Sequence, residues 1–272
     1  MTRFNKIVLL LLLFAIPCKA QNLYDEQHSA KFAEYLFQSQ QFDLAAQEYE
    51  RLLYMNDSAD YKLQLFKSYR KSGNLSLAAK RFSDILNDSI HSTSEPIAQE
   101  YVHLLMLQQD LPKAANFSNS NKNISELQNR YNLMQISMLS KNWKRADSLA
   151  SLIKGVDTEY LKVLESARNM KHRYAGLALT FSMIIPGAGK AYSGYWKDGI
   201  VSLLFVAATG WQSYRGFDKS GSKSTAGWIW GSISTGFYFG NLYGSFRSAK
   251  RYNNRQNEIL HQRAESYIYS TF

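Results

Sequence analysis

The run Pro-Gly-Ala-Gly-Lys at residues 186–190 comes closest to a chemical site, because glycine-rich loops that end in lysine can cradle phosphates. A phosphate-binding loop also needs a glycine five residues before its last glycine and a Ser or Thr after the lysine. Ile184 and Ala191 occupy those positions, and Tyr192 stands where the third glycine of a dinucleotide fingerprint belongs. The run therefore predicts a tight bend, in which proline ends a helix and glycine frees the backbone, and no nucleotide site.

Other reactive groups are sparse. The chain has a single cysteine, Cys18, and nothing resembles the strand-turn-helix elbow that carries a catalytic serine. The acidic residues of the first half have the pattern of solvated helix faces. The five histidines, none at metal-ligand spacing, are His28, His91, His103, His172 and His261. We expect a protein that is not an enzyme and that holds no metal and no cofactor.

Residues 1–20 have the pattern of a secretory signal peptide. Arg3 and Lys6 precede ten apolar residues at 7–16, and Cys-Lys-Ala before Gln21 offers small residues at the cleavage positions. An uncleaved anchor is the alternative, but ten residues make a helix of about 15 Å, half of a bilayer core. A lipid-modified Cys18 is a second alternative, although Pro17 is unusual before such a cysteine.

The net charge of +10 is unevenly distributed. Residues 21–170 carry 17 Lys/Arg and 18 Asp/Glu, whereas residues 171–272 carry 12 Lys/Arg and four Asp/Glu. The basic excess flanks apolar segments, where cations anchor helices at lipid headgroups. This distribution favours membrane lipid as a partner and argues against nucleic acid.

A self-similar pattern runs from about residue 25 to residue 155. Phe-Asp-Leu-Ala-Ala-Gln-Glu-Tyr at 42–49 matches Leu-Ser-Leu-Ala-Ala-Lys-Arg-Phe at 75–82, and two weaker copies follow. The first alanines of the four copies are 33, 36 and 32 residues apart. This resembles the tetratricopeptide repeat, a helix–turn–helix unit of about 34 residues. The residues expected to pack the repeats are Ala45, Tyr49, Ala78, Phe82, Ala114 and Ala146.

The copies are degenerate at two places. Phe66 stands where the preceding copy has the small Ala33, and no aromatic residue lies four positions after Ala114. A solenoid of such units offers a groove lined by its first helices. By position alone, the candidate groove residues are Tyr35, Gln38, Lys62 and Tyr69.

Three apolar stretches follow the repeats, at residues 174–185, 199–214 and 226–246. A helix needs about 20 apolar residues to cross a bilayer, so only the third is long enough. The second is marginal, and the first ends at Pro186 and could be re-entrant. Whether two or three helices cross is left open.

Glycines recur every four residues in the third stretch, at Gly227 and Gly231 and again at Gly236, Gly240 and Gly244. Small residues at this spacing form a stripe along which a second helix can approach closely in lipid. We expect the last three glycines to form a helix-packing face.

The bend and its flanks carry a second resemblance. A signature of Ser, Pro-Gly-x-Gly, Tyr and Tyr-Trp-Lys is typical of an uncharacterised bacterial membrane-domain family, which implies an envelope location and no activity. Here Lys190 replaces the usual glutamine. The residues that carry the match are Pro186, Gly187, Gly189, Lys190, Tyr192 and Trp196.

We therefore expect an all-α chain, a helix–turn–helix repeat solenoid followed by a small glycine-rich membrane helical bundle. The expected parts are a signal peptide (1–20), the repeat array (21–156), a connecting helix (157–173), the membrane domain (174–250) and a polar tail (251–272). The expected function is that of a scaffold at a bacterial inner membrane, whose periplasmic repeats bind a protein or peptide. The alternative is a subunit of a transport or envelope-assembly complex in which the glycine-rich helices are the functional part.

Overall fold

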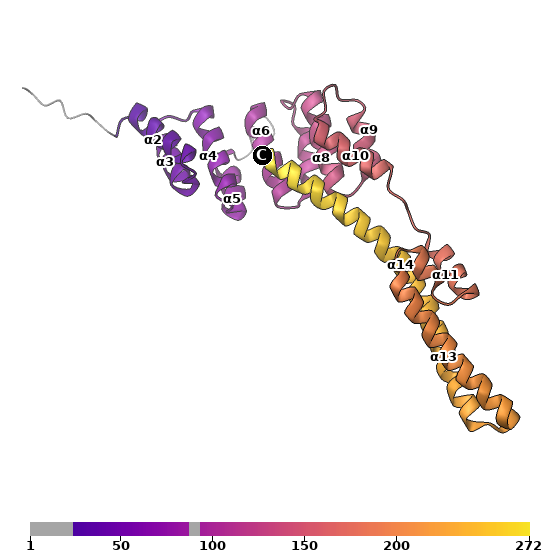
Figure 1. The fold of residues 1–272 in the computed structure, drawn as a ribbon. Coiled ribbons are helices and arrows are strands. Elements are labelled where there is room, and N and C mark those ends of the chain that lie inside the picture. The colour runs from indigo at the N-terminus through magenta and orange to yellow at the C-terminus, as the bar shows by residue number, and fades with distance from the viewer. Residues whose placement is uncertain (1–23, 87–92) are drawn as a thin grey trace, which may run out of the picture. The chain divides into compact units, whose positions relative to one another are not determined.

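The computed structural model describes residues 24–86 and 93–272, which form helices and connecting loops without any strand. The predicted all-α class is therefore confirmed. The signal-like segment at residues 1–20 lies outside the described residues. The chain divides into two compact units, Met1–Ser125 and Glu126–Phe272, which are described separately (Figure 1).

The first unit consists of helix pairs, drawn from indigo to magenta in Figure 1. Polar side chains cap the helices: Asp25 accepts from the backbone N–H of His28, and Ser58 accepts from that of Asp60. The pairs are α2 (Glu26–Gln38) with α3 (Phe42–Met55), α4 (Ala59–Lys71) with α5 (Leu75–Leu86), and α6 (Glu95–Leu107) with α7 (Leu111–Ser120).

The second unit begins with a further pair and ends with a helical hairpin. Its helices are α8 (Glu126–Leu139), α9 (Trp143–Ala150), α10 (Thr158–Arg168), α11 (Ala175–Ile184), α12 (Ala188–Tyr192), α13 (Trp196–Ser220) and α14 (Thr225–Ser270), with a 3₁₀ turn η2 at Gly221–Lys223. The helix α13 and the first half of α14 lie side by side in Figure 1.

The turn inside each of these helix pairs has the same backbone geometry. One residue adopts a left-handed conformation, with φ of 60° at Gln40, 81° at Gly73, 60° at Gln109 and 58° at Lys141. Each of these residues precedes a repeat alanine by five positions, so the turns recur at the spacing of the alanines. Glycine adopts this conformation without steric cost, whereas the other three residues are held in it by the packing of their helices.

The helix α14 is continuous over 46 residues and ends at Ser270, so residues 251–270 continue it as a helix where the sequence predicts a separate polar tail. Leu260, Ala264 and Ile268 are buried on one face of its second half, which packs against α8 and α10. Polar contacts add to this packing. Trp143 Nε1 donates to Asn257 Oδ1 at 3.0 Å, and the Tyr267 hydroxyl donates to Asp157 at 2.5 Å.

Across the described parts of the chain, none of the helices has both the length and the apolar character that a membrane crossing requires. The crossing expected at residues 226–246 is not supported. The physical reason is composition, because glycine, serine, threonine and asparagine interrupt the apolar residues of this segment.

Candidate functional site

The structure places the six repeat-packing residues in the core. The four alanines have no exposed surface, and Tyr49 and Phe82 are 4% and 0% exposed. The Phe82 ring stacks on that of Phe66 with centroids 3.7 Å apart, so the large residue at the position of a small one is accommodated by ring stacking.

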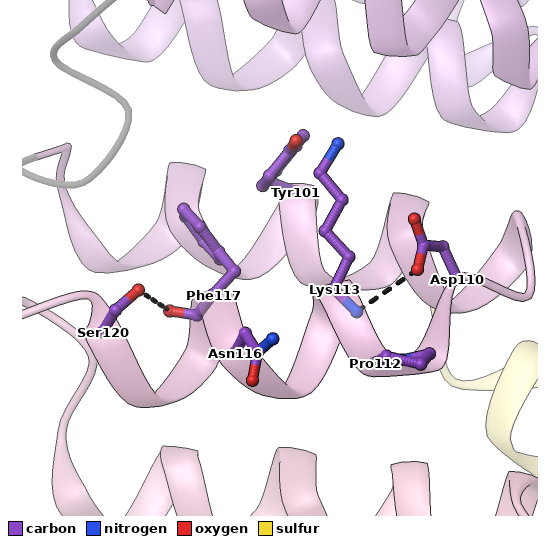
Figure 2. Close-up of a pocket in the computed structure, with 7 residues that line it drawn as sticks. All are labelled: Tyr101, Asp110, Pro112, Lys113, Asn116, Phe117 and Ser120. Carbon is purple, nitrogen blue, oxygen red and sulfur yellow. Dashed lines mark hydrogen bonds between the residues drawn. The ribbon is translucent and has the colours of Figure 1, made fainter.

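In the third helix pair, Phe117 takes the role of the missing aromatic residue, although it lies three and not four residues after Ala114. Phe117 is buried and meets the ring of Tyr101 edge-on, with centroids 4.8 Å apart. Beside these rings lies a hollow of about 410 Å³ (Figure 2). Its rim combines charged and amide groups, and the Lys113 ammonium lies 5.9 Å from the centre of the Tyr101 ring. The lining residues are Tyr101, Asp110, Pro112, Lys113, Asn116, Phe117 and Ser120.

A buried ion pair joins α4 to α6. Arg70 Nε donates to Glu100 Oε2 at 2.7 Å, and both side chains are buried. His103 lies one helical turn from Glu100 and faces this pair. Burial and the nearby positive charges of Arg70 and Lys67 lower the pKa of His103 to about 3, so its imidazole is neutral at physiological pH.

The four candidate groove residues differ in accessibility. Tyr35 is 60% exposed, and Gln38 is exposed while donating to Glu34. Lys62 pairs with Asp57 at 2.7 Å. Tyr69 is buried and donates its hydroxyl to Glu50 at 2.7 Å, so its assignment to the groove is wrong.

In the second unit, the glycines of the bend form the point where α11, α12, α13 and α14 meet. Gly187 has a φ of +89°, and its N–H donates to Asn241 Oδ1 at 3.0 Å. A Cβ on Gly187 would lie 2.0 Å from the Gly199 carbonyl oxygen, and a Cβ on Gly189 would lie 1.7 Å from that of Ala178. These glycines are required because backbone packs directly on backbone.

Serine and asparagine side chains hold this junction together. Ser182 Oγ accepts from the Gly189 N–H at 2.9 Å and shares a 2.7 Å hydrogen bond with Ser245. Both serines and Asn241 are buried. The sequence reasoning missed Asn241 and Ser245, because they lie more than 50 residues from their partners and no local pattern marks them.

The other residues of the bend signature lie at the edge of the junction. Lys190 Nζ donates to Ser202 Oγ at 2.6 Å. The ring of Tyr192 meets Phe181 edge-on at 5.3 Å, and Trp196 is 57% exposed at the start of α13. Pro186, which is half-buried, follows the last residue of α11 closely and prevents that helix from continuing.

Of the three glycines expected to form a helix-packing face, Gly236, Gly240 and Gly244, only the last packs against another part of the chain. Gly244 packs against the Lys190 side chain, but a Cβ on Gly236 or Gly240 would meet nothing within 4 Å. The expectation for these two glycines is therefore corrected. The close contacts between α13 and α14 are made instead by Gly227 against Phe217 and by Gly231 against Ser213, because these glycines face α13.

The hairpin of α13 and α14 has small and polar residues inside and large apolar residues outside. Thr209 and Ser213 are buried, and Ser213 Oγ donates to the Gly227 carbonyl oxygen at 2.9 Å. In contrast, Leu204 and Phe239 are 62% and 63% exposed. We call the exposed apolar side chains of α11, α13 and α14 the apolar belt. It includes Leu177, Phe181, Ile184, Ile200, Val201, Leu204, Phe205, Trp211, Trp228, Ile229, Phe237 and Phe239.

No metal-binding group of three or more His, Cys, Asp or Glu side chains occurs among residues 24–86 and 93–272. No family model, curated protein or solved structure matches the chain. The two resemblances noted in the sequence therefore remain predictions. Two surface features remain as candidates for binding a partner: the hollow beside α7 and the apolar belt.

Proposed function

We propose that this chain is a non-catalytic scaffold whose helical repeats bind a protein or peptide and whose hairpin attaches it to a membrane as a small glycine-rich bundle. Its proposed location is the inner membrane of a bacterial envelope, with the repeats in the periplasm. The periplasmic placement rests on the signal peptide predicted at residues 1–20.

The apolar belt is the observation that carries the attachment. In water, large exposed apolar patches mark interaction or membrane surfaces. A hairpin with small polar residues inside and large apolar residues outside is suited to lipid, where helices associate through small residues and interhelical hydrogen bonds. Ser213 and Gly227 provide such a bond between α13 and α14.

The hollow beside α7 supports peptide binding. Aromatic side chains of Tyr101 and Phe117 lie beside the charged rim of Asp110 and Lys113 (Figure 2). Interfaces combine a buried apolar centre with a polar rim in the same way. A hollow of about 410 Å³ has room for one or two side chains of a partner.

Site-directed photocrosslinking in native membranes tests the partner. A photoreactive residue at Asn116, on the exposed rim, should give a discrete crosslinked protein. The matched control is Lys80, which is exposed on α5 and outside the hollow. Adducts of equal yield at both positions, or none at Asn116, would refute the hollow as the binding surface.

A further inference from the structure

Five cations gather at one end of the apolar belt. Arg173 precedes α11, Lys197 lies in the first turn of α13, and three more lie within about one turn near the middle of α14. The ring of Tyr195 lies under Arg251, so the start of α13 and the middle of α14 are neighbours. We call these side chains the basic collar: Arg173, Lys197, Arg247, Lys250 and Arg251.

Aromatic rings, not carboxylates, are the neighbours of these cations. A cation over a ring face keeps its charge and most of its donors available. The cation-to-centroid distances are 5.0 Å for Arg173 over Tyr192, 5.4 Å for Arg173 over Tyr252, 5.7 Å for Lys197 over Trp196, 5.7 Å for Arg247 over Tyr243, 4.5 Å for Lys250 over Phe246 and 5.7 Å for Arg251 over Tyr195.

The collar has an unbalanced positive charge. Between residues 171 and 255 the only acidic residues are Asp198 and Asp218. Among the described residues, no collar cation forms an ion pair, whereas several cations of the repeats do. In addition, Arg173 Nε is buried and lacks a hydrogen-bond acceptor in the described parts of the chain.

The collar borders the apolar belt directly. Ile200 and Leu204, both exposed, follow Lys197 by one and two turns of α13. Lys190, which donates to Ser202, extends the positive charge toward the belt. Cations and Trp or Tyr rings beside apolar side chains are typical of the headgroup level of a membrane.

We propose that the basic collar binds the phosphates of anionic phospholipids, so that the chain selects anionic membranes. This inference rests on the membrane attachment proposed above. Arginine and lysine donors suit phosphate oxygens, and clustered cations beside a membrane helix favour anionic lipids. The adjoining apolar belt, which would accept acyl chains, favours lipid over nucleic acid as the source of the phosphates.

Vesicle flotation of the full chain tests the proposal, with phosphatidylcholine alone and with phosphatidylcholine mixed equally with phosphatidylglycerol. The collar variant is Lys197→Gln/Arg247→Gln/Arg251→Gln. The control variant, Arg215→Gln/Lys219→Gln/Lys223→Gln, removes the same charge at the other end of the hairpin. All six side chains are exposed, so neither variant disturbs the core.

We expect the chain to bind the mixed vesicles more tightly than phosphatidylcholine alone, and added salt to remove the difference. The collar variant should lose about fivefold in affinity for the mixed vesicles per cation removed, while the control variant keeps the preference. Equal binding to both vesicles, or equal losses in both variants, would overturn the proposal and leave the attachment standing.

Absence of binding to either vesicle would refute the membrane attachment itself, so the two failures are distinguishable. Binding of a single-stranded oligonucleotide that depends on the collar, combined with no preference among vesicles, would assign the collar to nucleic acid and also overturn the proposal.

Discussion

Arg70 and Glu100 form a buried ion pair, 2.7 Å from Nε to Oε2, that joins the second helix pair to the third. The two side chains are 6% and 7% exposed, so water screens their attraction very little. The pair therefore adds a buried, charged contact to the packing between α4 and α6.

We expect Arg70→Met to lower the free energy of unfolding by about 3–5 kcal/mol, because Glu100 would remain as an unpaired buried charge. The measurement is urea unfolding of the full chain followed by far-UV circular dichroism. The double variant Arg70→Met/Glu100→Met should recover most of the loss, since a buried pair can often be replaced by apolar residues without cost. A double variant as unstable as the single one would show that the pair has a different role.

We expect the free energy of unfolding to decrease as the pH is lowered, because His103 is buried in its neutral form. The unfolded side chain takes up a proton as the pH drops through about 6.5, whereas the folded side chain, with a pKa of about 3, stays neutral. Stability is therefore lost below pH 6.5 and the loss levels off near pH 3. Between pH 7 and pH 5 we expect a loss of about 2 kcal/mol in the free energy of unfolding.

The control for this pH dependence is His103→Gln, which has no titrating group. Its stability should change much less between pH 7 and pH 5 in the same urea titrations. If the variant loses as much stability as the parent chain, another group is responsible.

Gly189→Ala should disrupt the junction of the second unit. The new Cβ would lie 1.7 Å from the carbonyl oxygen of Ala178, and backbone cannot yield as a side chain can. We expect a loss of about 3 kcal/mol or more, measured by thermal unfolding in detergent. Gly236→Ala is the matched control, because its Cβ would meet nothing within 4 Å and alanine favours a helix. A Gly189→Ala protein as stable as this control would contradict the packing described.

Ile268→Ala should loosen the second half of α14. This side chain is fully buried against α8 and α10, and removing a buried isoleucine typically costs about 2–5 kcal/mol. Amide hydrogen exchange of residues 257–270 should accelerate. Ile259, which is 45% exposed on the same helix, supplies the control Ile259→Ala. Equal exchange in the two variants would show that the segment is not held by this face.

The helix pairs of the repeats can be predicted from the sequence because the residues that define each pair lie close together in the chain. Each repeat alanine lies five residues after a tight turn, so packing and turn recur together and the spacing of four alanines reveals both. The helix–turn–helix pairs were thus readable from residues such as Ala45 and Ala78. The spacing does not identify which face of each helix is buried: Tyr69, predicted to line a groove, is buried and donates its hydroxyl to Glu50 on the preceding helix.

The second unit was harder to predict because its contacts join distant residues. Asn241 caps the Gly187 bend from 54 positions away, and Tyr267 reaches back to Asp157. A signal for the C-terminal helix was present, since Leu260, Ala264 and Ile268 are spaced by four residues. Polar residues surround these three positions, so the composition of the segment predicts a polar tail.

The continuous helix α14 sets an angle as well as a distance. It carries part of the apolar belt in its first half, three cations of the basic collar near its middle, and the face that packs on α8 and α10 in its second half. A helix turns by about 100° per residue, so the number of residues between these faces decides which way the belt points. Deleting Gln256 would swing the belt by about 100° around the helix axis, whereas inserting seven residues there would return it to within about 20°. The direction in which the belt points relative to α8 and α10 therefore depends on the number of residues in α14.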